Sequence, residues 1–123
     1  MNEISSVDKK FQKELNAGLT ALILLQVMRQ SEEPMYGYQI AKTIVEEKEN
    51  SMQIKQGVLY PVLRSLEGNG LLESSVEPSI SGPPRRYYHI TPNGEETLIR
   101  WVNLWQQTRN FVDEVLGGTK SDA

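Results

Sequence analysis

The chain has 123 residues, which is enough for one domain with a modest hydrophobic core. It contains no cysteine, which excludes disulfide bonds, thiolate metal sites and cysteine nucleophiles. Thirteen basic and sixteen acidic residues give a net charge of −3, which disfavours a nucleic-acid partner unless the charges are segregated on different faces.

A first helix is predicted over residues 8–29, because apolar residues recur there at helical spacing and Pro34 stops the pattern. Its second half is apolar on nearly all sides, so we expect it at the centre of the fold. This apolar run is too short to cross a membrane, and the first residues are polar and unlike a signal peptide. We therefore expect a cytoplasmic protein with no membrane partner.

A second helix is expected from Tyr36 to about Glu46, and a third from Gln56 to about Asn69. Pro61 lies inside the third helix, where a proline costs about 3 kcal/mol or more. The residue four positions earlier is Gly57, which has no side chain, so the backbone can bend there at little cost.

The third helix has two contrasting faces. The apolar face is formed by Val58, Leu59, Val62, Leu63 and Leu66. The other face carries hydrogen-bonding, flat or small residues, namely Gln53, Gln56, Gly57, Tyr60, Pro61 and Arg64. No acidic residue occurs between positions 53 and 66. A face of this kind can press its backbone closely against a large anionic partner, although the same pattern is compatible with an ordinary solvated helix.

A glycine-rich turn follows at residues 68–70, and the pattern then changes to alternation. Leu72, Val76, Tyr88 and Ile90 alternate with polar residues, which predicts the two strands of a β-hairpin. The tip is rich in proline, serine and glycine, contains no acidic residue, and ends in two arginines at positions 85 and 86.

A last helix is predicted from Pro92 to about Leu116, with Thr91 as its amino-terminal cap. It carries two apolar stripes, which exceed what one small domain can cover, so we expect a partner helix from a second copy of the chain. The residues expected to form this homodimer interface are Leu98, Trp101, Val102, Trp105, Val112 and Leu116.

The order helix, helix, helix, hairpin, helix is that of a winged helix-turn-helix. The expected fold class is mainly α with a small β-hairpin. We expect a DNA-binding domain over residues 8–91, a dimerisation helix over residues 92–116 and a tail over residues 117–123. In this arrangement the third helix enters the major groove of double-stranded DNA, and the hairpin, or wing, contacts the phosphates beside it.

Three blocks of the sequence resemble the PadR-type transcriptional regulators: MYGYQIAK at residues 35–42, GVLYPVLRSLEGNGLL at residues 57–72 and GPPRRYYHITPNG at residues 82–94. The single terminal helix resembles the short subfamily, which includes multidrug-sensing repressors. The resemblance implies a homodimeric repressor on a pseudo-palindromic operator, released by an aromatic or drug-like effector or by another signal. Lys55 stands where the family often has serine, and Gln56 and Val58 replace commoner residues, so the operator sequence is expected to differ.

The candidate DNA-binding residues follow from the winged-helix arrangement. Gln56 can read adenine, whereas Arg64, late in the helix, is better placed for a phosphate. Tyr60 can donate its hydroxyl group to a phosphate. The remaining residues expected to approach DNA are Lys10, Lys13, Gln39, Lys42, Lys55, Gly57, Arg85 and Arg86. For each of them, simple exposure to solvent is the alternative.

Trp105 has two interpretations that the sequence leaves open. It can belong to the apolar core of the dimer. In the drug-sensing relatives, however, a tryptophan at the matching position stacks on flat ligands, which implies a planar aromatic small molecule here. The other residues of that site would be Leu15, Gly18 and Leu22 on the first helix, together with Val102.

Two other classes of function, an enzyme and a protein-assembly module, fit the sequence less well. An enzyme would need a nucleophile with a base or a set of metal ligands, and one histidine without cysteine or clustered carboxylates does not supply them. We therefore expect no catalytic residue, no metal and no cofactor. A winged helix used only for protein assembly would present an apolar or acidic face on the third helix, whereas the face here is polar and basic.

Overall fold

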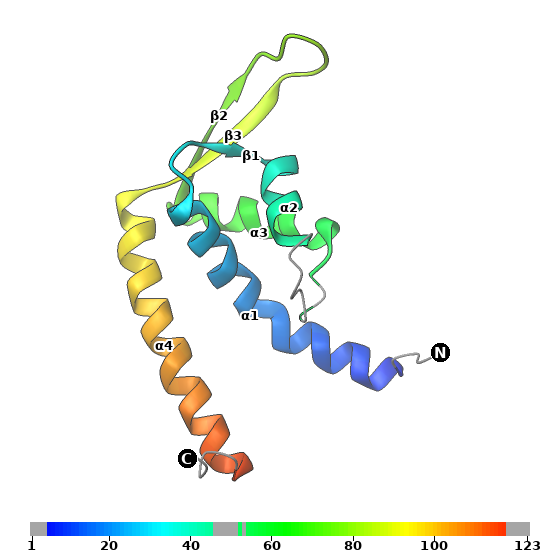
Figure 1. The fold of residues 1–123 in the computed structure, drawn as a ribbon, viewed down its shortest axis with the longest axis vertical. Helices are drawn as coiled ribbons and strands as arrows, with labels where there is room; N and C mark the ends of the chain where they lie inside the picture. Colours follow the sequence, from blue (N-terminus) through cyan, green and yellow to red (C-terminus); the bar gives the residue numbers. More distant parts are fainter. Residues whose placement is uncertain (1–4, 46–51, 53, 118–123) are drawn as a thin grey trace.

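The computed structural model describes residues 5–45, 52 and 54–117, arranged as four helices and a small sheet (Figure 1). The elements in chain order are α1 (Ser6–Gln30), β1 (Met35–Tyr36), α2 (Gly37–Val45), α3 (Gln56–Gly68), β2 (Leu72–Glu77), β3 (Arg85–Ile90) and α4 (Pro92–Leu116). This order confirms the predicted mainly α fold with a β-hairpin. The expected carboxyl end of the second helix, Gln53 and residues 118–123 of the tail lie outside the described residues.

The helix ends follow local capping chemistry. The hydroxyl group of Ser5 accepts a hydrogen bond of 3.1 Å from the backbone N–H of Asp8 at the start of α1. Thr91 caps α4 in the same way, accepting from the N–H of Gly94 at 2.9 Å. Lys55 precedes α3 without a side-chain cap, as expected for a residue that replaces serine. None of the helices in the described ranges is both long and apolar enough to cross a membrane.

The sheet has one strand more than the sequence predicted. The strand order is β1-β3-β2, all antiparallel, and β1 pairs Met35 with Tyr88 and Tyr36 with Tyr87. Tyr36 was expected to begin the second helix, but it lies in β1 and α2 starts one residue later. A strand of two residues has no alternation to detect, so only the three-dimensional pairing reveals it.

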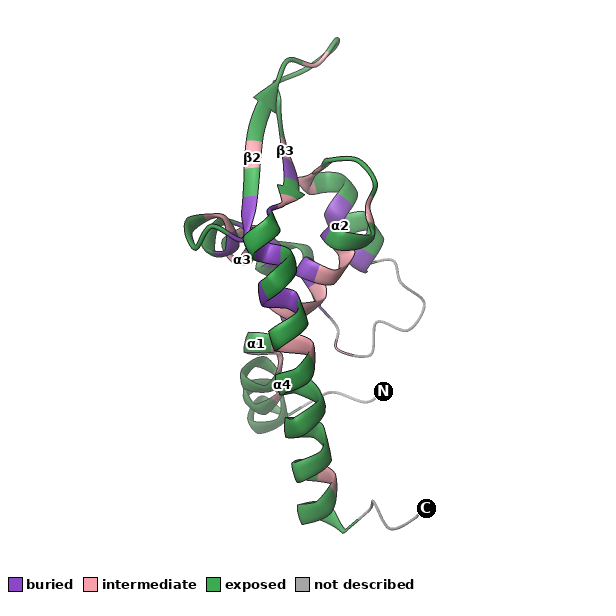
Figure 2. Cartoon of the chain, turned by 90° about the vertical axis from the view of Figure 1, so that its left-hand side faces the viewer, coloured by how far each residue is buried: buried purple, intermediate pink, exposed green. Residues whose placement is uncertain are grey.

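The hydrophobic core lies where α1, α2 and α3 meet the inner face of the sheet (Figure 2). The second half of α1 is central, as predicted, with Leu24 and Leu25 fully buried. Two residues differ from expectation. Val58 was assigned to the apolar face of α3 but is 47% exposed. Leu98 was assigned to the dimer interface, but with 1% exposure it belongs to the core of its own chain and has almost no surface left for a partner.

The start of α4 is locked to the segment that follows α3. The backbone N–H of Thr91 donates to the carbonyl of Leu71 at 3.1 Å, and its hydroxyl group donates to the carbonyl of Gly70 at 2.8 Å. Gly94 packs so closely here that a Cβ atom would collide with the Leu71 carbonyl and lie 2.7 Å from Ile90. These contacts fix the start of α4 to Gly70 and Leu71, the residues that follow the turn at the end of α3.

Candidate nucleic-acid interface and interhelical pocket

At the amino-terminal end of α3, the outward face carries few long side chains. Gln56, Gly57 and Pro61 are exposed, and so is Arg64 one turn later. A Cβ atom built on Gly57 would meet no atom within 4 Å. No neighbouring side chain therefore gives a steric reason for glycine at this position, and its role within the fold is limited to letting the backbone yield to Pro61 four residues later.

Tyr60 does not share this exposure, contrary to the sequence-based expectation. Its side chain is partly buried against the hydrophobic core. A Cβ atom on Gly37 would lie 2.8 Å from the Tyr60 hydroxyl oxygen, so the tyrosine ring fills the space that the glycine leaves at the start of α2. Tyr60 thus packs α3 against α2.

The two wing arginines are held by different partners on opposite faces of β3. The guanidinium carbon of Arg85 lies 4.4 Å from the centre of the Tyr36 ring, and that ring meets Tyr87 edge-on at 5.3 Å. On the other face, Arg86 donates from Nη1 to the hydroxyl oxygen of Ser74 at 3.0 Å. Tyr36 of β1 is therefore the aromatic partner of Arg85.

Tyr88 lies at the centre of the inner face of the wing. Burial, followed by the negative charge of Glu67, raises the pKa of the Tyr88 hydroxyl group above its usual value of 10.0, while Arg86 and Arg64 act in the opposite direction. The phenol is therefore protonated at neutral pH. Charged side chains of both α3 and the wing therefore influence this one hydroxyl group.

The predicted lysines are exposed, but they do not form one group. Lys13 and Lys55 line the same groove of about 690 Å³ between α1 and α3. Lys42 lies beside a different groove, at the junction of α1 and α2. The Oε1 atom of Gln39 accepts a hydrogen bond of 3.0 Å from the backbone N–H of Tyr36, so this side chain is occupied with the start of α2.

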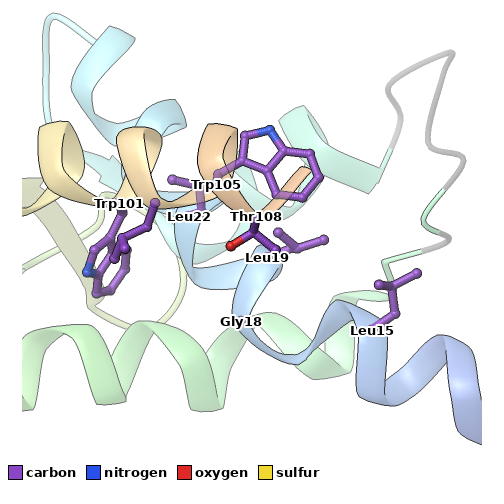
Figure 3. A pocket seen from close by; sticks show the side chains of 8 residues that line it. Leu15, Gly18, Leu19, Leu22, Trp101, Trp105 and Thr108 are labelled. Atoms are coloured by element: carbon purple, nitrogen blue, oxygen red, sulfur yellow. The ribbon is translucent and has the colours of Figure 1, made fainter. Parts of the chain in front are cut away.

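A pocket of about 320 Å³ lies between α1 and α4 (Figure 3). Its lining residues are Leu15, Gly18, Leu19, Leu22, Trp101, Leu104, Trp105 and Thr108. The predicted residues Leu15, Gly18, Leu22 and Trp105 therefore do come together, whereas Val102 is not part of the lining. A Cβ atom on Gly18 would meet nothing within 4 Å, so this glycine leaves open space in the wall.

Four residues of this lining were not predicted from the sequence, namely Leu19, Trp101, Leu104 and Thr108. Leu19 follows Leu15 by one helical turn, and Thr108 follows Trp105 by three positions, so helical spacing contains part of the signal. Trp101 was predicted only as a residue of the homodimer interface.

Beyond the pocket, α1 and α4 diverge (Figure 1), and large apolar side chains remain exposed on both helices. On α1 these are Val7, Phe11 and Leu15. On α4 they are Ile99, Leu104, Trp105, Phe111, Val112, Val115 and Leu116. Figure 2 shows this end of α4 as almost entirely exposed. A run of exposed apolar residues of this length is typical of a protein–protein interface.

The profile of the transcriptional regulator PadR-like family matches residues 24–100, from the central part of α1 through the wing into α4. The chain belongs to this family. The resemblance seen in the three sequence blocks is thereby confirmed. PadR-like proteins are transcriptional regulators and not enzymes, which also confirms the prediction that the chain has no catalytic function.

Relatives and solved structures agree with this assignment. An uncharacterized protein X of Lysinibacillus sphaericus is 32% identical over 100 residues, covering 81% of this chain and 89% of the relative. A transcriptional regulator of Mycobacterium tuberculosis is 35% identical over 71 residues, covering 58% of this chain and 63% of the relative. A transcriptional regulator structure from Clostridium thermocellum is 28% identical with a TM-score of 0.69, covering 91% and 97% of the two chains. A PadR-like regulator from Bacillus cereus is 28% identical with a TM-score of 0.65, covering 84% and 96%.

Proposed function

We propose that this PadR-like protein binds a pseudo-palindromic DNA operator as a homodimer and acts as a repressor. The observation that carries the proposal is the outward face of α3, where Gly57 has no packing partner and lies beside exposed polar and basic side chains. A glycine that no neighbouring side chain requires, on the exposed face of a helix in a regulator family, allows a partner to approach the backbone closely.

Gln56 and the basic residues of α3, the wing and the flanking helices have different roles in this proposal. Gln56 lies at the start of α3 and reads a base edge, while Arg64 holds a phosphate. Arg85 and Arg86 hold phosphates beside the groove. The exposed lysines, Lys10, Lys13, Lys42 and Lys55, supply further contacts to the flanking backbone. Selecting duplexes from a random library with the full chain tests the proposal directly, because an assembly module without DNA affinity would enrich no sequence.

The dimer is predicted to form through the exposed apolar side chains of α1 and α4. The chain should sediment at twice its 14.0 kDa mass at micromolar concentration. Phe111→Glu combined with Val115→Glu should shift it to monomers, because the glutamates would be buried without partners. Gln106→Glu adds a charge to the exposed opposite side of the same helix and should leave the dimer intact. A folded wild-type monomer under these conditions would remove the basis for a palindromic operator, whose half-sites should lie roughly 34–36 Å apart.

Arg85 of the wing is predicted to position the protein without selecting sequence. Arg85→Ala should weaken binding to selected and random duplexes by similar factors. The log–log slope of affinity against salt should flatten by about 0.9 for each phosphate that the variant no longer neutralises. Gln56→Ala should instead reduce the preference for the selected duplex at an unchanged salt slope. An Arg85→Ala variant that altered the preferred sequence but not the salt dependence would contradict this division of roles.

We also propose that a planar aromatic effector binds in the pocket between α1 and α4. The support is its apolar lining, the two tryptophans on one wall and the space left by Gly18. Its volume of about 320 Å³ lies at the lower end of the range for small-molecule sites. A second protomer packed on α4 would enclose the open side. Because the start of α4 is fixed to the segment after α3, a ligand that moves α4 also disturbs the helix that enters the groove.

A further inference from the structure

Glu67 is an unexpected residue in α3. It is the only acidic residue of this helix, and it lies in the last turn, where the carbonyl ends of the helix disfavour negative charge. On a helix that approaches phosphates, a carboxylate is also repelled by the partner. Its position therefore calls for an explanation within the protein.

The carboxylate of Glu67 is connected to the wing by two consecutive hydrogen bonds. Ser74 donates its hydroxyl proton to Oε2 of Glu67 at 2.6 Å, and the same hydroxyl oxygen accepts from Nη1 of Arg86 at 3.0 Å. A serine hydroxyl has a single proton, so its donation to Glu67 directs its lone pairs toward Arg86. The first and last groups of this connection, the Glu67 carboxylate and the Arg86 guanidinium, are both charged. Each of the two hydrogen bonds is therefore stronger than a bond between neutral groups.

The strand register places these groups on the inner face of the wing. Ser74 of β2 lies opposite Tyr88 of β3, and Arg86 lies opposite Val76. Side chains two residues apart on a strand share a face, so Ser74 and Arg86 are both on the side of buried Tyr88. Arg85 is on the opposite face, over Tyr36, and takes no part in the connection.

We propose that Glu67 is a positioning residue that acts through Ser74 to hold the guanidinium group of Arg86 at a fixed place relative to α3. The proposal rests on the DNA-binding function proposed above. With Arg86 held in this way, the helix and the wing meet the duplex as one rigid unit. An arginine already fixed in its bound position also loses less conformational freedom on binding.

This role predicts an effect on specificity and not simply on affinity. A released Arg86 side chain can reach a phosphate of any duplex, whatever the position of α3 in the groove. Breaking the connection should therefore weaken binding to the operator while sparing binding to random DNA. A carboxylate that only repelled phosphates would behave differently, because its removal would strengthen binding to all duplexes alike.

The test uses the full chain and the duplex that the wild-type protein selects from a random library. The measured quantity is the ratio of the dissociation constants for random and selected duplexes. Ser74→Ala and Glu67→Ala should each lower this ratio about three- to tenfold, the range for loss of one hydrogen bond. The double variant should fall no further than either single variant, since both residues act through one connection. Ser74→Thr keeps the hydroxyl group and should retain the wild-type ratio.

Glu73→Ala is the matched control, because it removes a glutamate next to Ser74 on β2 whose side chain lies on the opposite face of the wing and pairs with His89 at 3.1 Å. It should leave the ratio unchanged. If Glu67→Ala unfolds the protein, the comparison of Ser74→Ala with Ser74→Thr still tests the proposal. The proposal is overturned if Ser74→Ala keeps the wild-type ratio, or if the effects of Ser74→Ala and Glu67→Ala add. A wild-type chain that enriches no duplex would overturn the DNA-binding function itself and this role with it.

Discussion

Replacing Gly57 by leucine is expected to weaken binding to the selected duplex about a hundredfold without destabilising the protein. The position is exposed and an added Cβ atom would meet no atom within 4 Å, so we expect the folded chain to accommodate leucine. Leucine also favours a helix over glycine by roughly 0.8 kcal/mol, so the free energy of unfolding should rise. The leucine side chain would instead occupy the space between α3 and the bases. Gel shifts and thermal unfolding of the same preparation measure the two effects.

Gly68→Leu provides the control for this variant. Gly68 is also exposed on α3, and a Cβ atom there would meet nothing within 4 Å, but it lies at the other end of the helix. Gly68 follows Gly57 by eleven positions, which corresponds to about 16 Å along the helix axis. If only the amino-terminal end of α3 enters the groove, Gly68→Leu should bind nearly as the wild type does. Equal losses in the two variants, or no loss in Gly57→Leu, would contradict the proposed docking of α3.

The sequence predicted the fold because its long elements carry strong periodic patterns. The α4 helix begins at Pro92 and ends at Leu116 as expected, since a threonine cap, a proline and a glycine stop are local signals. The apolar half of α1 was placed at the centre for the same reason. Where the sequence failed, the deciding partner was distant in the chain, as with the two-residue strand β1, whose pairing with β3 has no local signature.

Two residues show how tertiary contacts decide the use of a side chain. Tyr60 lies at the border of the two faces of α3, and it turns inward because Gly37 on α2 leaves a space of suitable size. Leu98 lies on an apolar stripe that either the chain's own core or a second copy could cover, and the core covers it. Periodicity identifies an apolar face, but it does not identify what packs against that face.

The candidate site was predicted unevenly for a related reason. Helical spacing was enough to gather Leu15, Gly18 and Leu22 on one side of α1, facing α4. The connection from Glu67 to Arg86 depends instead on the register of β2 and β3 and on how the wing leans over α3. The local sequence predicts neither the register nor this packing, since the two strands are separated by an irregular tip.

Trp105→Ala is expected to weaken the binding of a planar dye by at least about a hundredfold while the dimer persists. Trp105 is 38% exposed and forms one wall of the pocket, opposite aliphatic residues of α1. Such a site has flat aromatic surface and favours planar compounds, including cationic ones. The measurement is quenching of tryptophan fluorescence by a bis-benzimidazole. The chain has two tryptophans, so Trp101 still reports quenching in Trp105→Ala, and Trp101→Phe isolates the signal of Trp105 in an otherwise wild-type chain.

The same experiment tests the coupling between effector and DNA. If dye binding weakens binding to the selected duplex, the duplex must weaken dye binding by the same factor, because the coupling free energy is reciprocal. Gly18→Leu fills the pocket from the α1 side and should abolish quenching although Trp105 is intact. This variant separates the effect of filling the pocket from the effect of removing the indole ring. Trp105→Phe keeps a flat aromatic wall and should retain most of the dye affinity. If the dye leaves the fluorescence unchanged and Trp105→Ala dissociates the dimer, Trp105 belongs to the dimer core and the pocket holds no effector.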